Sequence, residues 1–394
     1  MDEAMRFEHS FIEADAGYDA WGAVCAADFD GDGRPEFATG GKGGGFYHLY
    51  DLHPTTPRWT RHVITRAFSP NVGAAATDLD GDGRPEIVCG EWGDRLLYLR
   101  PPAAGLEDWS WHVVGKGLRD PHDVLAADLD GDGRDEVIVR EKDGPLHLFR
   151  PPADLCQPWE DSIIAERLPG DGTCVARLGG RGLSLVTNAG WFENVTGDAS
   201  VWRRHPLLEE RLNWHPESRL AVADLDADGL AEIVITESEV PRARLAVLHP
   251  GPPGEPWKAD IVLPAEMDLR ALHSLQVADL DGDGSLEIFT AEMENRKTDG
   301  LRARPRWWCL ARGRDWSWSR HILLDANLGT HCAVVADFDG DGRPDIVGKV
   351  WRANALNGAG GRNHVDFLRN VTPLLADEEA DRCQEGGRES RVRG

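Results

Sequence analysis

One acidic motif recurs along the chain and constrains its fold more than any other feature. The pattern Asp-x-Asp-x-Asp-Gly, with a further carboxylate at the ninth position, occurs in copies that begin at Asp28, Asp78, Asp128, Asp224, Asp279 and Asp337. A seventh copy that has lost its acids, RLGGRGLSLVTNAG, begins at Arg177, so that successive starts lie 50, 50, 49, 47, 55 and 58 residues apart. A period near fifty residues is typical of propellers, in which each repeat is a small sheet that cannot bury its faces alone. The sequence therefore predicts seven blades.

Each repeat divides into four short strands with alternating hydrophobicity. The last repeat lacks a fourth strand, and the segment that matches one, MRFEHSFI at residues 5–12, stands at the other end of the chain. We expect an all-β fold, a seven-bladed β-propeller of four-stranded blades over residues 1–372, closed by this N-terminal strand in the last blade. Closure removes the sheet edges that an open array exposes. Residues 373–394 are predicted to form a flexible C-terminal tail.

Composition excludes several classes of function. The 394 residues carry 43 Lys and Arg against 68 Asp and Glu, a net charge of −25, which repels phosphate backbones, so we expect no nucleic-acid partner. No apolar run reaches the roughly 18 residues of a membrane helix, and the first residues lack the basic and apolar regions of a signal peptide. We therefore expect no membrane partner and a cytoplasmic location, while the oligomeric state stays open. The seven cysteines are scattered without a Cys-x-x-Cys pair, which favours free thiols.

The six acidic loops have the ligand chemistry of calcium sites. Alternating carboxylates around a glycine turn direct hard oxygen ligands at one centre, by the same logic as an EF-hand loop without its helices. We predict up to six structural calcium ions, and the alternative is a set of empty surface turns. The expected ligands are Asp28, Asp30, Asp32 and Glu36; Asp78, Asp80, Asp82 and Glu86; Asp128, Asp130, Asp132 and Glu136; Asp224, Asp226, Asp228 and Glu232; Asp279, Asp281, Asp283 and Glu287; and Asp337, Asp339, Asp341 and Asp345.

The motif before each second strand, Asp-x-Asp-Gly-Asp-Gly-x-x-Glu/Asp with an apolar pair after it, resembles the FG-GAP/VCBS repeats of integrin-α-like propellers. The resemblance covers residues 5 to about 372 and implies the same propeller fold. That family includes lectins, adhesion heads, polysaccharide lyases and sugar dehydratases, so the fold alone does not settle an activity. The histidine-led strands DPHDVLAADLDGDG and ALHSLQVADLDGDG are similar to the propeller part of aldos-2-ulose dehydratase, which also has zinc. That enzyme carries cupin domains after its propeller, and this sequence shows none.

Three histidines stand apart from the others because each precedes the first acid of its loop by six residues. They are His122, His273 and His331, in the third, sixth and seventh repeats. At about 3.3 Å per residue, six residues place them roughly 20 Å from the acidic loops, at the opposite mouth of the central channel. Three imidazoles that converge on the axis suit one zinc ion with an open fourth position. The alternatives are that each histidine caps its own strand, or that they are catalytic without a metal.

The loops on the histidine side contain the irregular sequence, which usually marks a binding face. We expect a small-molecule or oligosaccharide ligand there. The candidate catalytic residues are His215 as a base, Tyr18 as an acid and Asp123, and the candidate substrate-binding residues are Trp21, Glu292, Lys349 and Trp351.

The function predicted from these residues is that of a carbohydrate-active lyase or dehydratase. A metal next to the reacting carbon assists removal of a proton from a sugar or keto-sugar, and β-elimination follows. A lectin-like propeller without catalysis and a cyclase or isomerase of a natural-product intermediate are the alternatives. A lectin is expected to have several similar pockets between blades, whereas an enzyme is expected to have one axial pocket.

Overall fold

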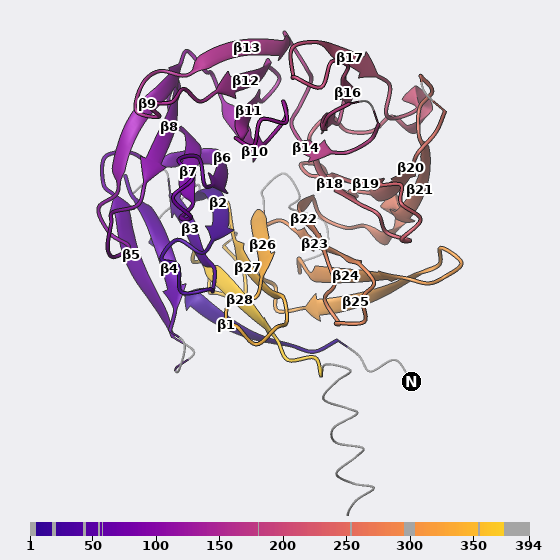
Figure 1. Cartoon of the computed structure of the whole chain (residues 1–394). Helices are drawn as coiled ribbons and strands as arrows, with labels where there is room; N and C mark the ends of the chain where they lie inside the picture. Colours follow the sequence, from indigo (N-terminus) through magenta and orange to yellow (C-terminus); the bar gives the residue numbers. More distant parts are fainter. Residues whose placement is uncertain are drawn as a thin grey trace, which may run out of the picture.

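The computed structural model describes residues 5–373 except 18–20, 42–44, 54–55, 57, 180, 253, 295–303 and 354. Seven four-stranded antiparallel sheets form a ring around a central axis (Figure 1). The predicted all-β, seven-bladed propeller is confirmed. The predicted tail, apart from residue 373, lies outside the described residues.

The blades follow one another along the chain, and each runs from an inner to an outer strand. Their strands are, in blade one, β2 (Trp21–Ala27), β3 (Glu36–Gly41), β4 (Tyr47–Leu52) and β5 (Trp59–Thr65); in blade two, β6 (Pro70–Thr77), β7 (Glu86–Glu91), β8 (Arg95–Arg100) and β9 (Ser110–Lys116); in blade three, β10 (Pro121–Ala127), β11 (Glu136–Glu141), β12 (Leu146–Arg150) and β13 (Glu160–Ala165); in blade four, β14 (Thr173–Ala176), β15 (Ser184–Thr187), β16 (Gly190–Asn194) and β17 (Trp202–His205); in blade five, β18 (Ser218–Ala223), β19 (Glu232–Glu237), β20 (Leu245–His249) and β21 (Lys258–Leu263); in blade six, β22 (Leu272–Ala278), β23 (Glu287–Glu292), β24 (Trp307–Arg312) and β25 (Trp318–Leu324); and in blade seven, β26 (Cys332–Ala336), β27 (Asp345–Lys349), β28 (Val365–Asn370) and β1 (Phe7–Glu13).

Blade seven closes the ring with the first strand of the chain. β1 pairs antiparallel with β28 in a register that runs from Phe7 opposite Asn370 to Glu13 opposite Val365. The His9 ring also contacts the Asp366 carboxylate at 2.8 Å. The strand lies one or two residues later than the segment predicted from the sequence, and the predicted closure is otherwise confirmed. Figure 1 shows β1 as the outer strand beside β28.

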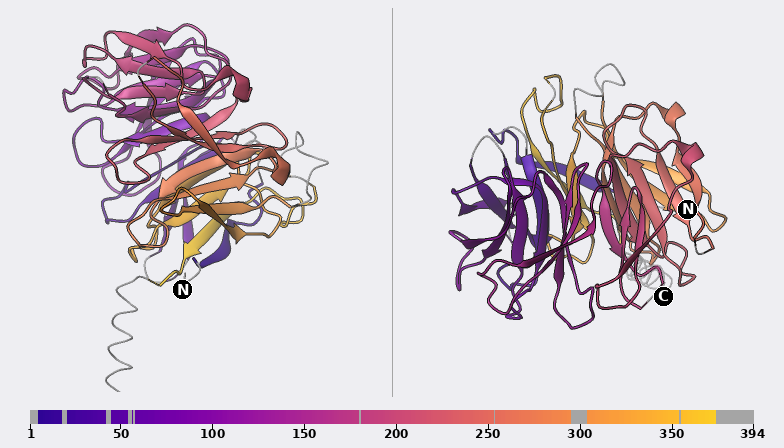
Figure 2. Two further views of the ribbon diagram at one scale, coloured as in Figure 1. Left: turned by 90° about the vertical axis from the view of Figure 1, so that its right-hand side faces the viewer. Right: turned by 90° about the horizontal axis from the view of Figure 1, so that it is seen from above.

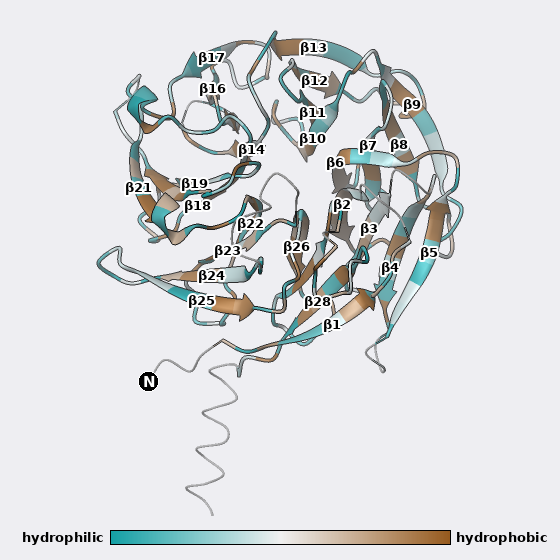
Figure 3. Cartoon of the chain, turned by 180° about the vertical axis from the view of Figure 1, so that it is seen from behind, coloured by the Kyte–Doolittle hydropathy of each residue, from teal (hydrophilic) through white to brown (hydrophobic). Residues whose placement is uncertain are grey.

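The hydrophobic core is itself a ring. Each of seven clusters of buried side chains joins two neighbouring blades. In the cluster between the first and last blades, Phe37 and Tyr50 of blade one pack against Phe338 and Phe367 of blade seven. Along the outer strands, hydrophobic and hydrophilic residues alternate (Figure 3), as expected where one face packs on a neighbour and the other meets solvent. Each blade thus depends on both of its neighbours for burial.

Small residues on the inner strands allow the blades to converge at the axis. A side-chain carbon placed on Gly22 of β2 would lie 2.3 Å from the Pro70 carbonyl oxygen, and one on Gly73 of β6 would lie 2.7 Å from the Val124 nitrogen. Because no Cβ atom tolerates such distances, these positions require glycine.

The short 3₁₀ turns η1 (Glu210–Leu212) and η2 (Ala265–Met267) lie on loops between blades, and Figure 2 shows the ring from two sides. Among the residues that the structure describes, no helix combines the length and the hydrophobicity that crossing a bilayer requires.

Candidate functional site

The acidic loops share one hydrogen-bonding frame. In the first loop, Asp28 Oδ1 accepts the Gly31 N–H at 2.7 Å and Asp28 Oδ2 accepts the Gly33 N–H at 2.9 Å. The ninth-position carboxylate of Glu36 turns back to accept the N–H of Phe29 at 2.8 Å. The same bond closes the other five loops, in which Glu86, Glu136, Glu232, Glu287 and Asp345 are the acceptors. The repeated sequence therefore gives a repeated turn.

Each loop places a buried ninth-position carboxylate beside aspartates that are more exposed. Burial, followed by the charges of the neighbouring aspartates, raises the pKa of Glu36 and of Glu287 to about 8. The same causes raise the pKa of Glu86 and Asp345 to about 7. An ionised carboxylate at the ninth position is therefore unfavourable in the protein alone, and a cation between the acids would remove the penalty.

Ligand atoms of these residues are close enough to share an ion. Oxygen atoms of Asp28, Asp30, Asp32 and Glu36 all lie within 4.8 Å of one another. In three further loops the groups with this spacing are Asp78, Asp80 and Glu86; Asp128, Asp130 and Glu136; and Asp224, Asp226 and Glu232. The third acids Asp82, Asp132 and Asp228 are outside these groups. The donor set, oxygen only, fits calcium. The calcium sites stay a prediction, and the structure shows only that these oxygen atoms lie close to one another.

Arginines contact some of the loop acids. The Arg100 guanidinium lies 2.6 Å from Asp80 Oδ2, and Arg34 pairs with Asp32 in the first loop. In blade four, Arg177, Gly179 and Arg181 replace the acids, as the sequence indicates. The loop of blade four thus lacks the carboxylates that a calcium ion needs.

The axial histidines lie at the start of inner strands, at the opposite end of these strands from the acidic loops. His122 is in β10, His273 is in β22, and His331 directly precedes β26. Their exposed fractions are 5%, 1% and 3%, so all are buried. The sequence correctly places them on neighbouring parts of the axis, and their contacts differ.

His273 and His331 stack on each other and share a neighbour that the sequence interpretation missed. Their ring centroids are 3.7 Å apart, and His273 Nδ1 donates to the His331 carbonyl oxygen at 2.5 Å. Cys332 Sγ lies 3.2 Å from His331 Nδ1. Ligand atoms of His273, His331 and Cys332 lie within 4.8 Å of one another, which makes them a candidate metal group. The signal in the sequence was the cysteine next to His331 on an inner strand.

His122 has carboxylates as its neighbours. Its Nδ1 lies 3.2 Å from Asp123 Oδ1 and its Nε2 lies 3.3 Å from Asp171 Oδ2. Burial alone raises the pKa of Asp123, but the hydrogen bond with His122 and the charge of Arg219 lower it to about 2. A metal shared by all three histidines stays a prediction, and in this structure Cys332 is the residue that completes a group with the other two.

Two cations border the cluster, the half-buried Arg219 and the fully buried Lys349. Arg219 Nη2 donates to His273 Nε2 at 3.0 Å, and Arg219 Nη1 lies 3.6 Å from Asp123 Oδ1. The Lys349 ammonium donates to the Trp21 carbonyl oxygen at 2.5 Å, and burial lowers its pKa to about 8. These charges act on Cys332: burial alone raises the pKa of the thiol, but Lys349 and His273 lower it to about 6. Both charges therefore favour the thiolate form of Cys332.

The low pKa makes Cys332 the cysteine expected to react first at mildly acidic pH. The thiolate is the reacting form, so in metal-free protein its alkylation by iodoacetamide should rise with pH, reach half of its plateau near pH 6 and stay constant above pH 7. Peptide mapping by mass spectrometry after timed exposure measures this rate. Cys156, which is exposed, is the internal control in the same digest. A rate at Cys332 that still increases steeply above pH 8 would contradict the thiolate assignment.

The four predicted substrate-binding residues have different surroundings. Trp21 is 1% exposed and packs in the core cluster between blades one and seven, so its ring faces no ligand in this structure. Glu292 is fully buried and accepts from Trp308 Nε1 and Arg306 Nε, both at 3.1 Å. Trp351 is half-buried, and its ring centroid lies 5.1 Å from that of His331. Trp351 and Lys349 thus lie beside the axial cluster, whereas Trp21 and Glu292 support the blades.

His215 lies on the same side of the ring, in the loop before β18. Its Nδ1 accepts the Glu217 N–H at 3.2 Å, so a neutral ring carries its proton on Nε2. Glu217 pairs with Lys142 at 2.5 Å, and Lys142 lies 3.7 Å from Asp171. A chain of charged groups thus connects the His215 loop with Asp171, the carboxylate that His122 Nε2 contacts. Tyr18, the predicted acid, lies outside the described residues.

Comparisons with known proteins bear on the fold. The FG-GAP-like repeat matches residues 78–139 and 279–348. No curated protein matches the chain significantly. Among solved structures, a chain of the Photorhabdus luminescens Tc holotoxin pore with the mutation TccC3-D651A is similar at 14% identity, with a TM-score of 0.43. The match covers 94% of this chain and only 15% of that one. The ring of seven sheets and the two matched segments identify the chain as a seven-bladed β-propeller that carries FG-GAP-like repeats.

Proposed function

We propose that the chain is a carbon–oxygen lyase that acts on a sugar or keto-sugar at the axial cluster of His273, His331 and Cys332. The observation that supports this most is the meeting of two imidazoles and a low-pKa thiol within 4.8 Å, next to the cations of Arg219 and Lys349 and the His122–Asp123 pair. Groups from four blades are brought together at the end of the axis, and such clusters of perturbed titratable groups are typical of active sites.

The donor set fits zinc. Lys349 and His273 favour the thiolate form of Cys332, and burial lowers the pKa of His331 well below its usual range, so both are available without losing a proton to solvent. Thiolate and imidazole are ligands that zinc prefers, and three protein ligands leave one position for a substrate oxygen. A zinc ion held there would polarise a carbonyl or carboxylate next to the carbon that loses its proton. Arg219, which now donates to His273 Nε2, must release that nitrogen for it to bind the ion.

The surrounding residues have separable roles in the proposed reaction. Lys349 Nζ, with a pKa of about 8, is suited to accept the proton at mildly alkaline pH, where a large share of it is neutral. His215, which carries a proton on Nε2 when neutral, is suited to donate to the leaving hydroxyl rather than to act as the base. The half-buried Trp351 offers a ring face beside the cluster on which a sugar ring can stack.

Metal analysis of matched variants tests the proposal. The wild type is expected to contain about one equivalent of zinc, and His273→Ala and Cys332→Ala should each lose it together with elimination activity on a panel of sugar acids and keto-sugars. Their melting temperatures should stay close to that of the wild type. His321→Ala, on the outer strand β25, should keep both metal and activity. His122→Ala separates the ligand sets, because it loses zinc only if all three histidines share the ion. A His273→Ala protein with full zinc content would refute the site.

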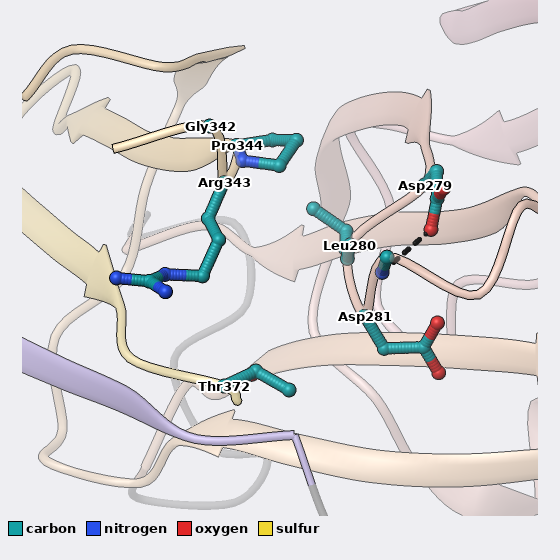
Figure 4. Close-up of a pocket in the computed structure, with 8 residues that line it drawn as sticks. Asp279, Leu280, Asp281, Gly342, Arg343, Pro344 and Thr372 are labelled. Carbon is teal, nitrogen blue, oxygen red and sulfur yellow. Dashed lines mark hydrogen bonds between the residues drawn. The ribbon is translucent and has the colours of Figure 1, made fainter. Parts of the chain in front are cut away.

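A binding propeller without catalysis is the second candidate, and the pockets between blades favour it. One of about 240 Å³ lies between the loops of blades six and seven, lined by Leu280, Arg343 and Thr372 (Figure 4). Another of about 410 Å³ lies between blades four and five. Repeated pockets between blades are what a lectin-like protein is expected to have. Saturable glycan binding by a protein that contains no zinc would favour this candidate over the lyase.

We also propose that calcium occupies the six acidic loops and acts structurally. The ligand spacing in four of the loops supports this, as does the raised pKa of the ninth-position carboxylates, which a dication would relieve.

A further inference from the structure

At several junctions between blades, a side chain of one blade binds the backbone of the preceding blade, and we call this side chain the plug. In blade two, the seventh loop residue is Arg84, which reaches across to blade one. Its Nε and Nη2 donate to the Phe29 carbonyl oxygen at 3.1 and 2.7 Å, and its Nη1 donates to the Pro102 carbonyl oxygen at 2.7 Å. Phe29 is the second residue of the preceding loop, and Pro102 follows the third strand of blade two by two residues. The guanidinium therefore closes the gap between two blades by binding backbone carbonyls from both.

At other junctions, the backbone carbonyl of the second loop residue also accepts a hydrogen bond from the next blade, but the donor stands at a different position of the repeat. Between blades five and six, Arg312 at the end of β24 donates from Nε to the Leu225 carbonyl at 3.0 Å and lies over the Trp316 ring at 4.8 Å. Asn194 and Asn370, at the ends of β16 and β28, donate to the equivalent carbonyls of Leu129 and Leu280 at 2.8 and 2.7 Å. At four of the seven junctions, therefore, a side chain of the next blade donates to this carbonyl, and the residue that supplies the donor differs.

The junction between blades four and five has lost both donors. The seventh loop residue of blade five is Leu230, whose side chain has no donor and is 57% exposed. The residue at the end of β20 is His249, whose ring is turned to Asp260 at 3.1 Å and to Trp316 of blade six at 4.4 Å. The carbonyl equivalent to that of Phe29 belongs to Leu178 in the decayed loop of blade four.

A cavity is found where the plug is missing. Its volume is about 410 Å³, against about 240 Å³ for the pocket at the junction of blades six and seven, where Arg343 is present (Figure 4). Leu178 and Gly251 line the cavity, at the positions that Phe29 and Pro102 hold around the Arg84 guanidinium. Leu230 lines it as well. The cavity is therefore bordered by the same backbone positions that bind a guanidinium in blade two.

We propose that this cavity binds a planar cation of the guanidinium class, such as the side-chain group of arginine. The cavity is also lined by two carboxylates, Glu193 and Glu255. The stacked rings of Trp191 and His205, whose centroids lie 4.2 Å apart, line it as well. Carboxylates and aromatic rings are the groups that hold arginine at other sites.

The remaining charges favour a planar donor over a point charge. Glu193 already contacts His205 at 2.9 Å and Arg203 at 3.3 Å, and Arg177 also lines the cavity. A compact ammonium gains little from carboxylates that are partly neutralised in this way. A guanidinium, in contrast, can donate several hydrogen bonds in one plane to backbone carbonyls, as Arg84 does.

Binding of small probes to the whole chain tests the proposal. Methylguanidinium and N-acetyl-L-arginine amide are titrated into the wild type by calorimetry, with N-acetyl-L-lysine amide and the neutral N-acetyl-L-citrulline amide as matched controls. We expect saturable binding of the two guanidinium probes, at least tenfold tighter than that of either control. Equal affinities of the two probes indicate a site for a free guanidinium compound, and tighter binding of the arginine amide indicates one for a peptide-borne arginine.

The Leu230→Arg variant tests whether the probes bind in this cavity or elsewhere on the protein. The new side chain restores the residue found at this loop position in blades one, two, three and seven, so it should fill the cavity, raise the melting temperature and reduce probe binding at least tenfold. The axial site lies at the other end of the inner strands, so its metal content should not change. Probe binding that is absent in the wild type, equal for lysine and arginine amides, or unaffected by Leu230→Arg would overturn the proposal.

Discussion

Deletion of residues 1–13 is expected to leave no cooperatively folded protein, although it removes none of the axial residues. β1 pairs with β28 at six positions, and its loss exposes the edge of blade seven. At about 1 kcal/mol for each net hydrogen bond, the lost pairing is comparable with the whole free energy of unfolding of a typical domain, about 5–15 kcal/mol. Circular dichroism melting and size-exclusion chromatography of the truncated chain measure the effect.

A circular permutant provides the matched control. The Val371 N–H donates to the Arg6 carbonyl at 2.8 Å, and the Arg6 N–H donates to Thr372 Oγ1 at 2.9 Å, so the end of β28 lies beside the start of β1. Residues 5–13 placed directly after residue 373 should form an ordinary hairpin with β28 and restore a cooperative transition. If the truncated chain melts as sharply and at the same temperature as this permutant, the closing strand does not hold the ring.

Removal of calcium should lower the melting temperature strongly. Because an ion that binds only the folded state stabilises it by mass action, each site at a hundredfold excess over its Kd contributes about 2.7 kcal/mol. Asp279→Asn should reduce the calcium content by one ion, whereas Arg181→Ala, in the loop without acids, should leave it unchanged. Scanning calorimetry with and without chelator, combined with atomic emission analysis, measures both effects. Identical melting curves in excess chelator and excess calcium would exclude a structural role.

The pH dependence of the calcium-free protein follows from the same carboxylates. The folded-state pKa of Glu36 is about 8 against 4.5 as the ordinary value, so the folded protein holds a proton that the unfolded chain releases. This contribution to stability is complete below pH 4.5 and is lost as pH rises through about 8. In chelator, the melting temperature should therefore fall between pH 5.5 and pH 8. Calcium replaces the proton, so the gain on adding it should be larger at pH 8.

The fold could be predicted because its signals are local and repeated. The acidic turn between the first two strands appears six times in nearly the same letters, and the spacing sets the size of each blade. The closing strand could be inferred because the last repeat lacked one strand and the N-terminus offered a spare one. The strand bounds shifted by one or two residues, since Glu13 pairs with Val365 across a register irregularity that no local pattern encodes.

The axial site could be predicted in position but not in detail. The offset of six residues brings His273 and His331 together, because strand geometry fixes where a residue stands along the axis. Which way each ring turns depends on residues of neighbouring blades: His122 turns to Asp171, and His331 turns to Cys332. For Trp21, near a strand end on this face, stacking on a sugar ring and core packing between blades were both open, and its ring is buried between blades one and seven. Such contacts between distant segments have no period in the sequence.

The closing strand also sets when the protein can finish folding during its synthesis. β1 leaves the ribosome before the other strands of the ring, whereas its partner β28 is the last strand of the ring to be made, with Phe7 and Asn370 as partners at one end of the pairing. At about 5–20 residues per second, β1 waits roughly 20 to 70 seconds for β28. Six blades can stack on their neighbours in that time, but the ring stays open until the last repeat has been translated. A ribosome that stalls in the last repeat therefore holds an open ring whose first strand is free to pair with another chain.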